Sequence, residues 1–249
     1  HDLNEIYRNT VQTVKTLVAE SGVAPETIAG IGISNQRETT AIWDKATGEP
    51  LEEAIVWQCG RASGIAQEIA EQGHAEEIRE ATGLQLSAYF PAAKMAWLLR
   101  NGGEERQKRA ADGKLCLGTI DSWLVYKLTG DHAFKTDFSN ASRTQLFNLK
   151  TLAWDEKICE IFGIPACALA RVCDSDAVYG TTTMEGLFSE PVPICGVLGD
   201  SHAALFGQGC LKPGMIKATY GTGSSLMMNI GDKPIQSLSL IHISEPTRH

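Results

Sequence analysis

The sequence predicts an α/β protein in which short apolar strands alternate with amphipathic helices. Residues 193–198 form an apolar run of strand length, whereas residues 3–18 carry apolar side chains at helical spacing. The composition, 43% hydrophobic and 21% charged over 249 residues, is typical of a folded globular chain. The strand at 193–198 stops at Gly199 and leads directly into a helical pattern. Asp200 should therefore lie at the carboxyl edge of a sheet, where open α/β folds hold ligands.

Composition and charge argue against several functional classes. The formal net charge is −8 and there is no long basic block, which argues against a nucleic-acid partner. No apolar stretch approaches the roughly 20 residues that cross a bilayer, and the N-terminus has no signal-peptide pattern. The seven cysteines are scattered without metal-ligand or disulfide spacing. We expect a soluble cytoplasmic protein without a membrane partner or a metal cluster.

The N-terminal part is predicted to form a helix followed by strands. The helix covers residues 3–18, and Gly22 is its stop signal. Extended apolar patterns predict strands at 28–34, 40–43 and 54–57, with a hairpin turn at 45–49 between the last two.

The middle of the chain is predicted to be mostly helical. Helical patterns run from 62 to 99 with breaks at Gly73, Gly83 and Pro91. Further on, the patterns predict a strand at 115–117, a helix that Asp121 caps and that stops at Gly130, and a helix at 155–162.

The C-terminal part is predicted to combine an irregular segment, a strand-helix unit and a hairpin. Residues 163–192 contain glycine, proline and short polar runs, and the strand-helix unit follows at 193–207. The hairpin strands are expected at 215–220 and 224–230, on either side of a Gly-Thr-Gly turn.

A charged pair follows the first predicted strand. Arg37 supplies a fork of donors and Glu38 supplies acceptors, a combination that suits the vicinal hydroxyls of a polyol. An ordinary surface ion pair is an equally good interpretation from these residues alone.

The Gly221-Thr222-Gly223 turn offers backbone N–H groups with little steric bulk, which can approach phosphate oxygens. A plain hairpin turn explains the same residues. The chain has no GxxxxGK[ST] loop and no complete dinucleotide fingerprint.

The segment around Asp200 allows two chemistries. A carboxylate at a strand-helix corner suits a general base. Residues 199–203 also nearly match the GxSxG elbow of serine hydrolases, with Ser201 as nucleophile, although the later acid and base could come only from Asp232 and from His242 or His249. Trp57 and Tyr89 are either core aromatics or walls of a sugar-sized pocket.

Several motifs occur in a fixed order along the chain: SNQRE at 34–38, AIVWQC at 54–59, TGL at 82–84, GTIDSWLVYKLTG at 118–130, TDFSNASRTQLFN at 136–148, GD at 199–200, AALFGQ at 203–208 and YGTGS at 220–224. This ordered set resembles the FGGY carbohydrate kinases, and most closely the members that phosphorylate glycerol. The resemblance implies a ribonuclease-H-like, actin-type fold, with a mixed sheet flanked by helices.

The same resemblance implies a domain organisation. Residues 1–236 would form the N-terminal, substrate-binding lobe, with the family's opening strand hairpin expected before residue 1 and the second lobe after about residue 235. Residues 237–249 do not continue the pattern and resemble a translated sequencing adapter, so we expect a non-native tail.

The resemblance also implies an activity, the ATP-dependent phosphorylation of glycerol to glycerol 3-phosphate with Mg²⁺. Asp200 matches the catalytic base. The residues matching the substrate pocket are Arg37, Glu38, Trp57, Tyr89, Asp200 and Ser201, and those matching the nucleotide-phosphate hairpin are Gly221, Thr222 and Gly223.

One departure from the family keeps other substrates open. Kinases that act on glycerol usually carry glutamine after the catalytic aspartate, where this chain has Ser201. A shorter side chain leaves space, so a larger polyol or a ketose is an alternative substrate. A non-catalytic, actin-like nucleotide-binding module is a further alternative. We expect the 249-residue chain alone to be inactive, and the full-length protein could be a homo-oligomer.

Overall fold

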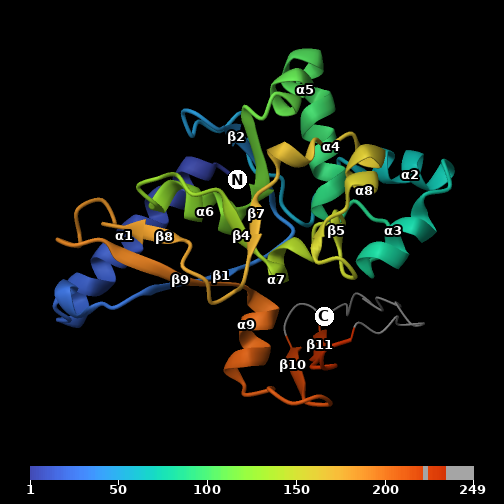
Figure 1. The fold of residues 1–249 in the computed structure, drawn as a ribbon. Coiled ribbons are helices and arrows are strands. Elements are labelled where there is room, and N and C mark those ends of the chain that lie inside the picture. The colour runs from blue at the N-terminus through green and yellow to red at the C-terminus, as the bar shows by residue number, and fades with distance from the viewer. Residues whose placement is uncertain (221–223, 234–249) are drawn as a thin grey trace, which may run out of the picture.

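The computed structural model describes residues 1–220 and 224–233. Most of the chain forms one body, from which a smaller arm projects at the end of strand β9 (Val192–Gly199) (Figure 1). The arm consists of helix α9 (Asp200–Gly207) and an antiparallel hairpin of β10 (Ile216–Tyr220) and β11 (Ser224–Met228). The predicted strand-helix unit and the hairpin strands are therefore confirmed. The Gly-Thr-Gly turn, residues 221–223, lies outside the described residues.

A three-stranded sheet carries the strand that leads to the arm. Strand β1 (Ile31–Asn35) pairs in parallel with β9, and β8 (Gly180–Thr182) pairs with the other edge of β9 in the antiparallel sense. Because Asn35 is in register with Gly199, β1 and β9 end at the same edge. This shared edge positions the segments that follow both strands.

A second sheet pairs β2 (Thr40–Asp44) with β3 (Leu115–Thr119) in the antiparallel sense. The prediction of a strand at 54–57 is wrong. Ile55 makes only an isolated bridge with Thr40, because the chain turns directly afterwards, where the Cys59 N–H donates to the Val56 carbonyl.

The remaining strands are short. Strand β4 (Lys135–Asp137) pairs in parallel with β7 (Arg171–Cys173), and β5 (Phe147–Asn148) pairs with β6 (Ala153–Trp154) in the antiparallel sense. The segment predicted to be irregular, 163–192, thus contains β7 and β8.

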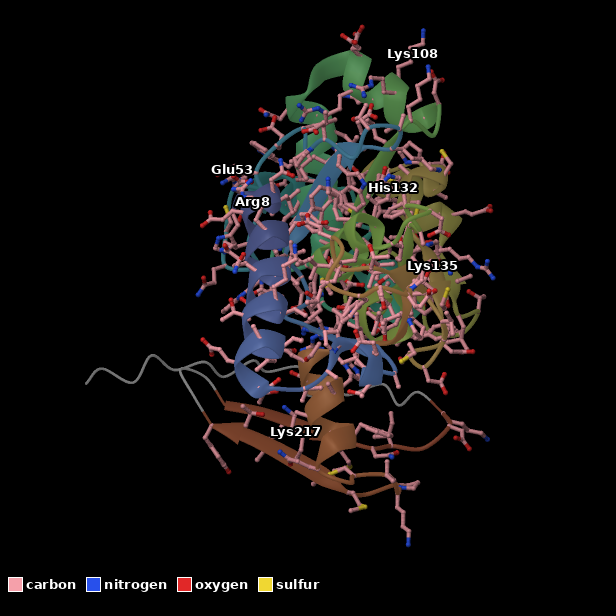
Figure 2. All side chains as sticks on the ribbon, turned by 90° about the vertical axis from the view of Figure 1, so that its left-hand side faces the viewer. Arg8, Glu53, Lys108, His132, Lys135 and Lys217 are labelled. Carbon is pink, nitrogen blue, oxygen red and sulfur yellow. The ribbon has the colours of Figure 1, made fainter. Side chains whose placement is uncertain are left out.

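Helices cover the sheets. In chain order they are α1 (Leu3–Ser21), the 3₁₀ turn η1 (Pro25–Thr27), α2 (Ser63–Glu71), α3 (Ala75–Thr82), α4 (Pro91–Asn101), α5 (Gly103–Ala111), α6 (Ile120–Leu128), α7 (Phe138–Ala141), α8 (Glu156–Phe162) and the 3₁₀ turn η2 (Ala166–Ala168). Figure 2 shows α1 along one face of the body, with Arg8 on its outer side, and the hairpin that carries Lys217 below.

Most of the predicted helix boundaries are confirmed. Gly22 ends α1 in the left-handed conformation at φ 69°, and Pro91 is the first residue of α4. The Asp155 carboxylate accepts the Ile158 N–H and so caps α8. The prediction that Asp121 caps its helix is wrong, because Asp121 lies inside the first turn of α6 and its buried carboxylate binds other side chains.

The apolar core consists of three clusters of buried side chains between the helices and the strands. One cluster joins α2, α4 and α8 to β2 and β3, with Ile42, Leu98 and Leu117 fully buried. A second joins α1, α6 and β9, and a third centres on Trp43, whose ring meets Trp123 edge-on at 5.2 Å. Among the described helices, none is long and apolar enough to cross a bilayer.

Candidate functional site

The segments that follow β1 and β9 meet at the shared sheet edge. An Nη of Arg37 donates to Ser201 Oγ at 3.0 Å. The Arg37 Nε lies 3.3 Å from Asp200 Oδ1 in an ion pair whose geometry is not that of a hydrogen bond. The structure thus brings together Arg37, Asp200 and Ser201, three residues singled out from the sequence.

The turn after β1 has a strained backbone. Arg37 and Glu38 have φ angles of 41° and 55°, in the left-handed region that side chains other than glycine rarely adopt. The Thr39 N–H donates to the Arg37 carbonyl at 2.7 Å and closes a tight turn. Such strain persists only where the surroundings hold the backbone in place.

Glu38 is almost fully buried, with 2% of its surface exposed. Its Oε1 accepts from Arg143 Nε at 2.7 Å, and the Arg143 guanidinium lies 4.9 Å from the centre of the Phe90 ring. The sequence analysis did not select Arg143 as a site residue, although it lies in the TDFSNASRT motif. A buried carboxylate requires such a partner, because an unpaired charge in the interior is costly.

Two aromatic residues form a wall beside Glu38. The rings of Trp57 and Tyr89 meet edge-on with centroids 5.7 Å apart, and each side chain is partly exposed, at 38% and 37%. Burial raises the pKa of the Tyr89 phenol, and the Glu38 charge raises that pKa further. These two aromatics are therefore not ordinary core residues.

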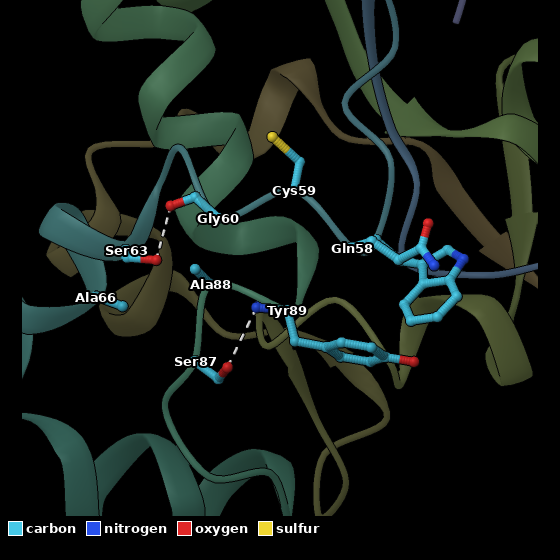
Figure 3. Close-up of a pocket in the computed structure, with 9 residues that line it drawn as sticks. Gln58, Cys59, Gly60, Ser63, Ala66, Ser87, Ala88 and Tyr89 are labelled. Carbon is cyan, nitrogen blue, oxygen red and sulfur yellow. Dashed lines mark hydrogen bonds between the residues drawn. The ribbon is translucent and has the colours of Figure 1, made fainter. Parts of the chain in front are cut away.

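A surface pocket of about 280 Å³ opens next to this wall (Figure 3). It is lined by residues 57–60 and 87–89 together with Ser63 and Ala66. Both aromatics line the pocket, and Tyr89 also lies close enough to Glu38 to sense its charge, whereas Arg37, Glu38 and Asp200 do not line the pocket.

Asp200 is the first residue of α9, and 54% of its side chain is exposed. Its Oδ1 accepts the Ser201 N–H at 2.6 Å. A carboxylate that is open to solvent at a strand end is accessible to a substrate hydroxyl and can accept its proton.

His202 is neutral at pH 7. Burial, and then the nearby Arg37 charge, lower the pKa of its imidazole to about 4. Its Nδ1 lies 3.5 Å from an Arg37 Nη, which fits an acceptor nitrogen facing a donor.

The geometry around Ser201 does not favour a hydrolase. A nucleophilic serine needs a general base that accepts its proton, but the hydrogen bond that the Ser201 oxygen makes is accepted from the Arg37 guanidinium, which is a donor only. Asp232 is exposed, and His242 and His249 lie outside the described residues.

A buried polar network holds the ends of β1 and β9 at their shared edge. The Gly199 N–H donates to Ser139 Oγ at 2.7 Å, and the Ser139 hydroxyl in turn donates to Asp137. The Asn35 amide donates to Asp121 at 3.0 Å and to Asn140 at 2.7 Å. The ends of both strands are therefore held by residues that sequence reasoning did not select.

The described residues, 1–220 and 224–233, contain no group of three or more His, Cys, Asp or Glu side chains that could hold a metal ion. Gly221, Thr222 and Gly223 lie outside the described residues. Tyr220 and Ser224, which flank them, are paired across the β10–β11 hairpin.

Residues 1–207 match the model of the FGGY family of carbohydrate kinases, N-terminal domain. The chain belongs to this family. The FGGY resemblance inferred from the ordered motifs is thereby confirmed.

Curated glycerol kinases share much of the sequence. The chain is 48% identical over 239 residues to glycerol kinase 2 of Thermotoga maritima, covering 96% of this chain and 48% of that protein. It is 50% identical over 234 residues to glycerol kinase of Enterococcus faecalis, covering 94% of this chain and 46% of that protein. The chain thus spans about half the length of these relatives.

Solved structures of a glycerol kinase and a xylulose kinase share the fold. Plasmodium falciparum glycerol kinase with ADP superposes with a TM-score of 0.83 at 36% identity, over 92% of this chain and 46% of that one. Xylulose kinase from Lactobacillus acidophilus superposes with a TM-score of 0.79 at 23% identity, over 90% of this chain and 44% of that one. The predicted fold class, the actin-type α/β fold of these kinases, is confirmed.

Proposed function

We propose that this chain is the substrate-binding lobe of an ATP-dependent kinase that phosphorylates glycerol to glycerol 3-phosphate. The observation that carries the proposal is the contact of Arg37 with both Asp200 and Ser201 at the shared end of β1 and β9. A non-catalytic actin-like module would have no need for this constellation. The high identity to glycerol kinases supports glycerol as the substrate.

The residues at the end of β1, the aromatic wall and Asp200 have different roles in the proposed reaction. Arg37 and Glu38 hold hydroxyls of the polyol, and Trp57 and Tyr89 pack against its C–H surface. Asp200 accepts the proton of a primary hydroxyl as that oxygen attacks the γ-phosphorus in line and ADP leaves. Catalysis by this lobe then rests on positioning the hydroxyl beside its base.

The second substrate is ATP with bound Mg²⁺. In phosphoryl transfer Mg²⁺ binds mainly to the nucleotide phosphates and water, with few protein carboxylates. The lack of an acidic cluster in the described residues is compatible with a metal ion that arrives with ATP. We infer that Gly221, Thr222 and Gly223 contact the phosphates, as their motif implies.

The proposal assigns residues 1–236 to the N-terminal lobe of a longer protein and treats 237–249 as non-native. It also places the reaction in the cytoplasm, because all seven cysteines are free, as expected in a reducing compartment.

Sedimentation of the full-length protein would test whether it forms a homo-oligomer.

A different polyol or a ketose is the second candidate substrate. The observation in its favour is the short side chain of Ser201, whose hydroxyl binds Arg37. A glutamine at this position would extend further toward a substrate, so Ser201 leaves room for a longer one.

A substrate panel on the full-length kinase that carries this lobe tests the proposal. We expect glycerol to give the highest kcat/KM among glycerol, erythritol, xylulose and ribulose. Asp200→Asn should lower kcat by at least about 100-fold, the size expected for removing a general base. The control Asp176→Asn removes an exposed carboxylate elsewhere and should leave kcat unchanged.

Two results would contradict the proposal. Wild-type turnover by Asp200→Asn would exclude Asp200 as the base, and a preference for xylulose or ribulose would favour the second candidate. The purified 249-residue chain should not phosphorylate glycerol, because it spans about half the length of its glycerol kinase relatives and we propose that the other half supplies part of the phosphate contacts.

A further inference from the structure

Lys94 is a buried lysine that the proposed mechanism does not use. It lies in the first turn of α4 and has no exposed surface. Its Nζ donates to the carbonyl oxygen of Glu38 at 3.2 Å and to the carbonyl oxygen of Tyr89. One ammonium group thus joins two segments that are far apart in the sequence.

Both segments belong to the proposed polyol site. Glu38 lies in the strained turn after β1, and Tyr89 carries one ring of the aromatic wall. The Glu38 side chain is held by Arg143, but the Glu38 carbonyl is held by Lys94. A strained left-handed backbone at 37–38 persists only when its surroundings hold it, and the hydrogen bond from Lys94 of α4 to the Glu38 carbonyl helps to hold it.

We propose that Lys94 is a positioning residue that fixes the Glu38 turn against the Tyr89 wall and so sets the affinity of the site for its polyol. This inference rests on the proposed function for its substrate, but the two-segment contact itself does not depend on that function. Lys94 does not touch the substrate and acts only through Glu38 and Tyr89.

The strength of the Lys94 contact should depend on pH, because the amine loses its charge within an accessible pH range. Burial lowers the pKa of the amine to about 8, partly opposed by the Glu38 charge. The groups that face it are the Glu38 carboxylate, the Cys59 thiol and the Tyr89 ring, whose centroid is 6.0 Å from Nζ. Above pH 8 the neutral amine donates weaker hydrogen bonds, because charge-assisted bonds are the stronger kind.

Substrate affinity and stability should therefore respond to pH in opposite directions. As pH rises through about 8, the weaker contact should raise the KM for the polyol. Over the same range the contribution of this group to the free energy of unfolding increases, because its folded-state pKa lies below the unfolded value of 10.5. A purely structural lysine would not produce a rising KM together with rising stability.

Hydrogen exchange on the 249-residue chain tests the contact without an activity assay. The amides of Thr39, Thr40 and Phe90 all donate hydrogen bonds near the contact. In Lys94→Met we expect exchange at these amides to become at least about tenfold faster. The matched control Leu98→Ala lies one turn further along α4, is fully buried, and should lower stability without this local effect.

Kinetics of the full-length kinase provide the second test. Lys94→Met should raise the KM for the polyol about tenfold or more and leave the KM for ATP unchanged. Lys94→Gln, which retains a shorter donor, should give an intermediate value. Wild type and Cys59→Ser should both show the rise in polyol KM near pH 8, whereas Lys94→Met should show none.

The outcomes separate this inference from the proposed function. Equal local exchange in Lys94→Met and Leu98→Ala, or a polyol KM that stays flat from pH 7 to 9 in wild type, overturns the role of Lys94. A wild-type enzyme that phosphorylates no polyol contradicts the proposed function instead. The hydrogen-exchange comparison of Lys94→Met with Leu98→Ala then tests by itself whether Lys94 holds the two segments together.

Discussion

The side chain of Arg37 lies directly against the backbone of Gly199. A Cβ atom at Gly199 would come within 2.4 Å of Arg37 Cδ, although the Gly199 φ of −63° suits any residue. A side chain at this position would therefore force the Arg37 side chain to move, although the backbone conformation would accept it.

Gly199→Ala should displace the Arg37 guanidinium from Asp200 and Ser201. We expect the polyol KM of the full-length kinase to rise at least about tenfold, because a methyl group cannot fit without moving the side chain. Gly207→Ala is the matched control, since a Cβ there meets nothing within 4 Å. Similar kinetics for the two variants would show that the contact does not matter for binding.

Ser139→Ala should loosen the position of Asp200. The variant leaves the buried Gly199 N–H without a partner, which costs about 1–3 kcal/mol of stability. Urea unfolding of the 249-residue chain measures this cost, and kcat of the full-length kinase should fall. Ser142→Ala, which loses only a 3.2 Å bond to the Ser139 carbonyl, serves as the control. Loss of stability with an unchanged kcat would limit Ser139 to a structural role.

Asp121 should make stability depend on pH. Burial raises the pKa of its carboxyl group to about 6, so the folded state binds this proton more tightly than the unfolded state does. The contribution to the free energy of unfolding is present below pH 4 and is lost as pH rises to about 6, a change of roughly 2–3 kcal/mol. The difference in unfolding free energy between wild type and Asp121→Asn, measured from pH 4 to 7, should shrink by this amount. A constant difference would mean that Asp121 does not titrate in this range.

Arg143→Lys should impair substrate binding although it keeps the charge. Lysine lacks the planar group that pairs with Glu38 and lies over Phe90. We expect the polyol KM to rise about tenfold. Arg100→Lys changes an exposed ion pair between Arg100 of α4 and Glu68 of α2 and should have no effect, since exposed ion pairs contribute little. An unaffected KM in Arg143→Lys would show that charge alone suffices.

Local sequence signals predicted many of the elements correctly. Gly22, Pro91 and Asp155 mark helix ends through their own backbone or side-chain chemistry, so no distant contact is needed. The prediction failed for residues 54–57, where an apolar extended pattern does not reveal that a turn begins at Val56. It also failed for Asp121, because a carboxylate near a helix start resembles a cap even when it faces a buried network.

By itself the sequence determined the family, the α/β class and the position of Asp200 at a strand end, because these depend on residue order and local patterns. Only the tertiary structure decided which side chains support the site. Arg37 and Ser201 are 164 residues apart, Glu38 and Arg143 are 105 apart, and Glu38 and Lys94 are 56 apart. Such contacts form only when β1 pairs with β9 and α4 packs against β2, and no local pattern specifies that arrangement.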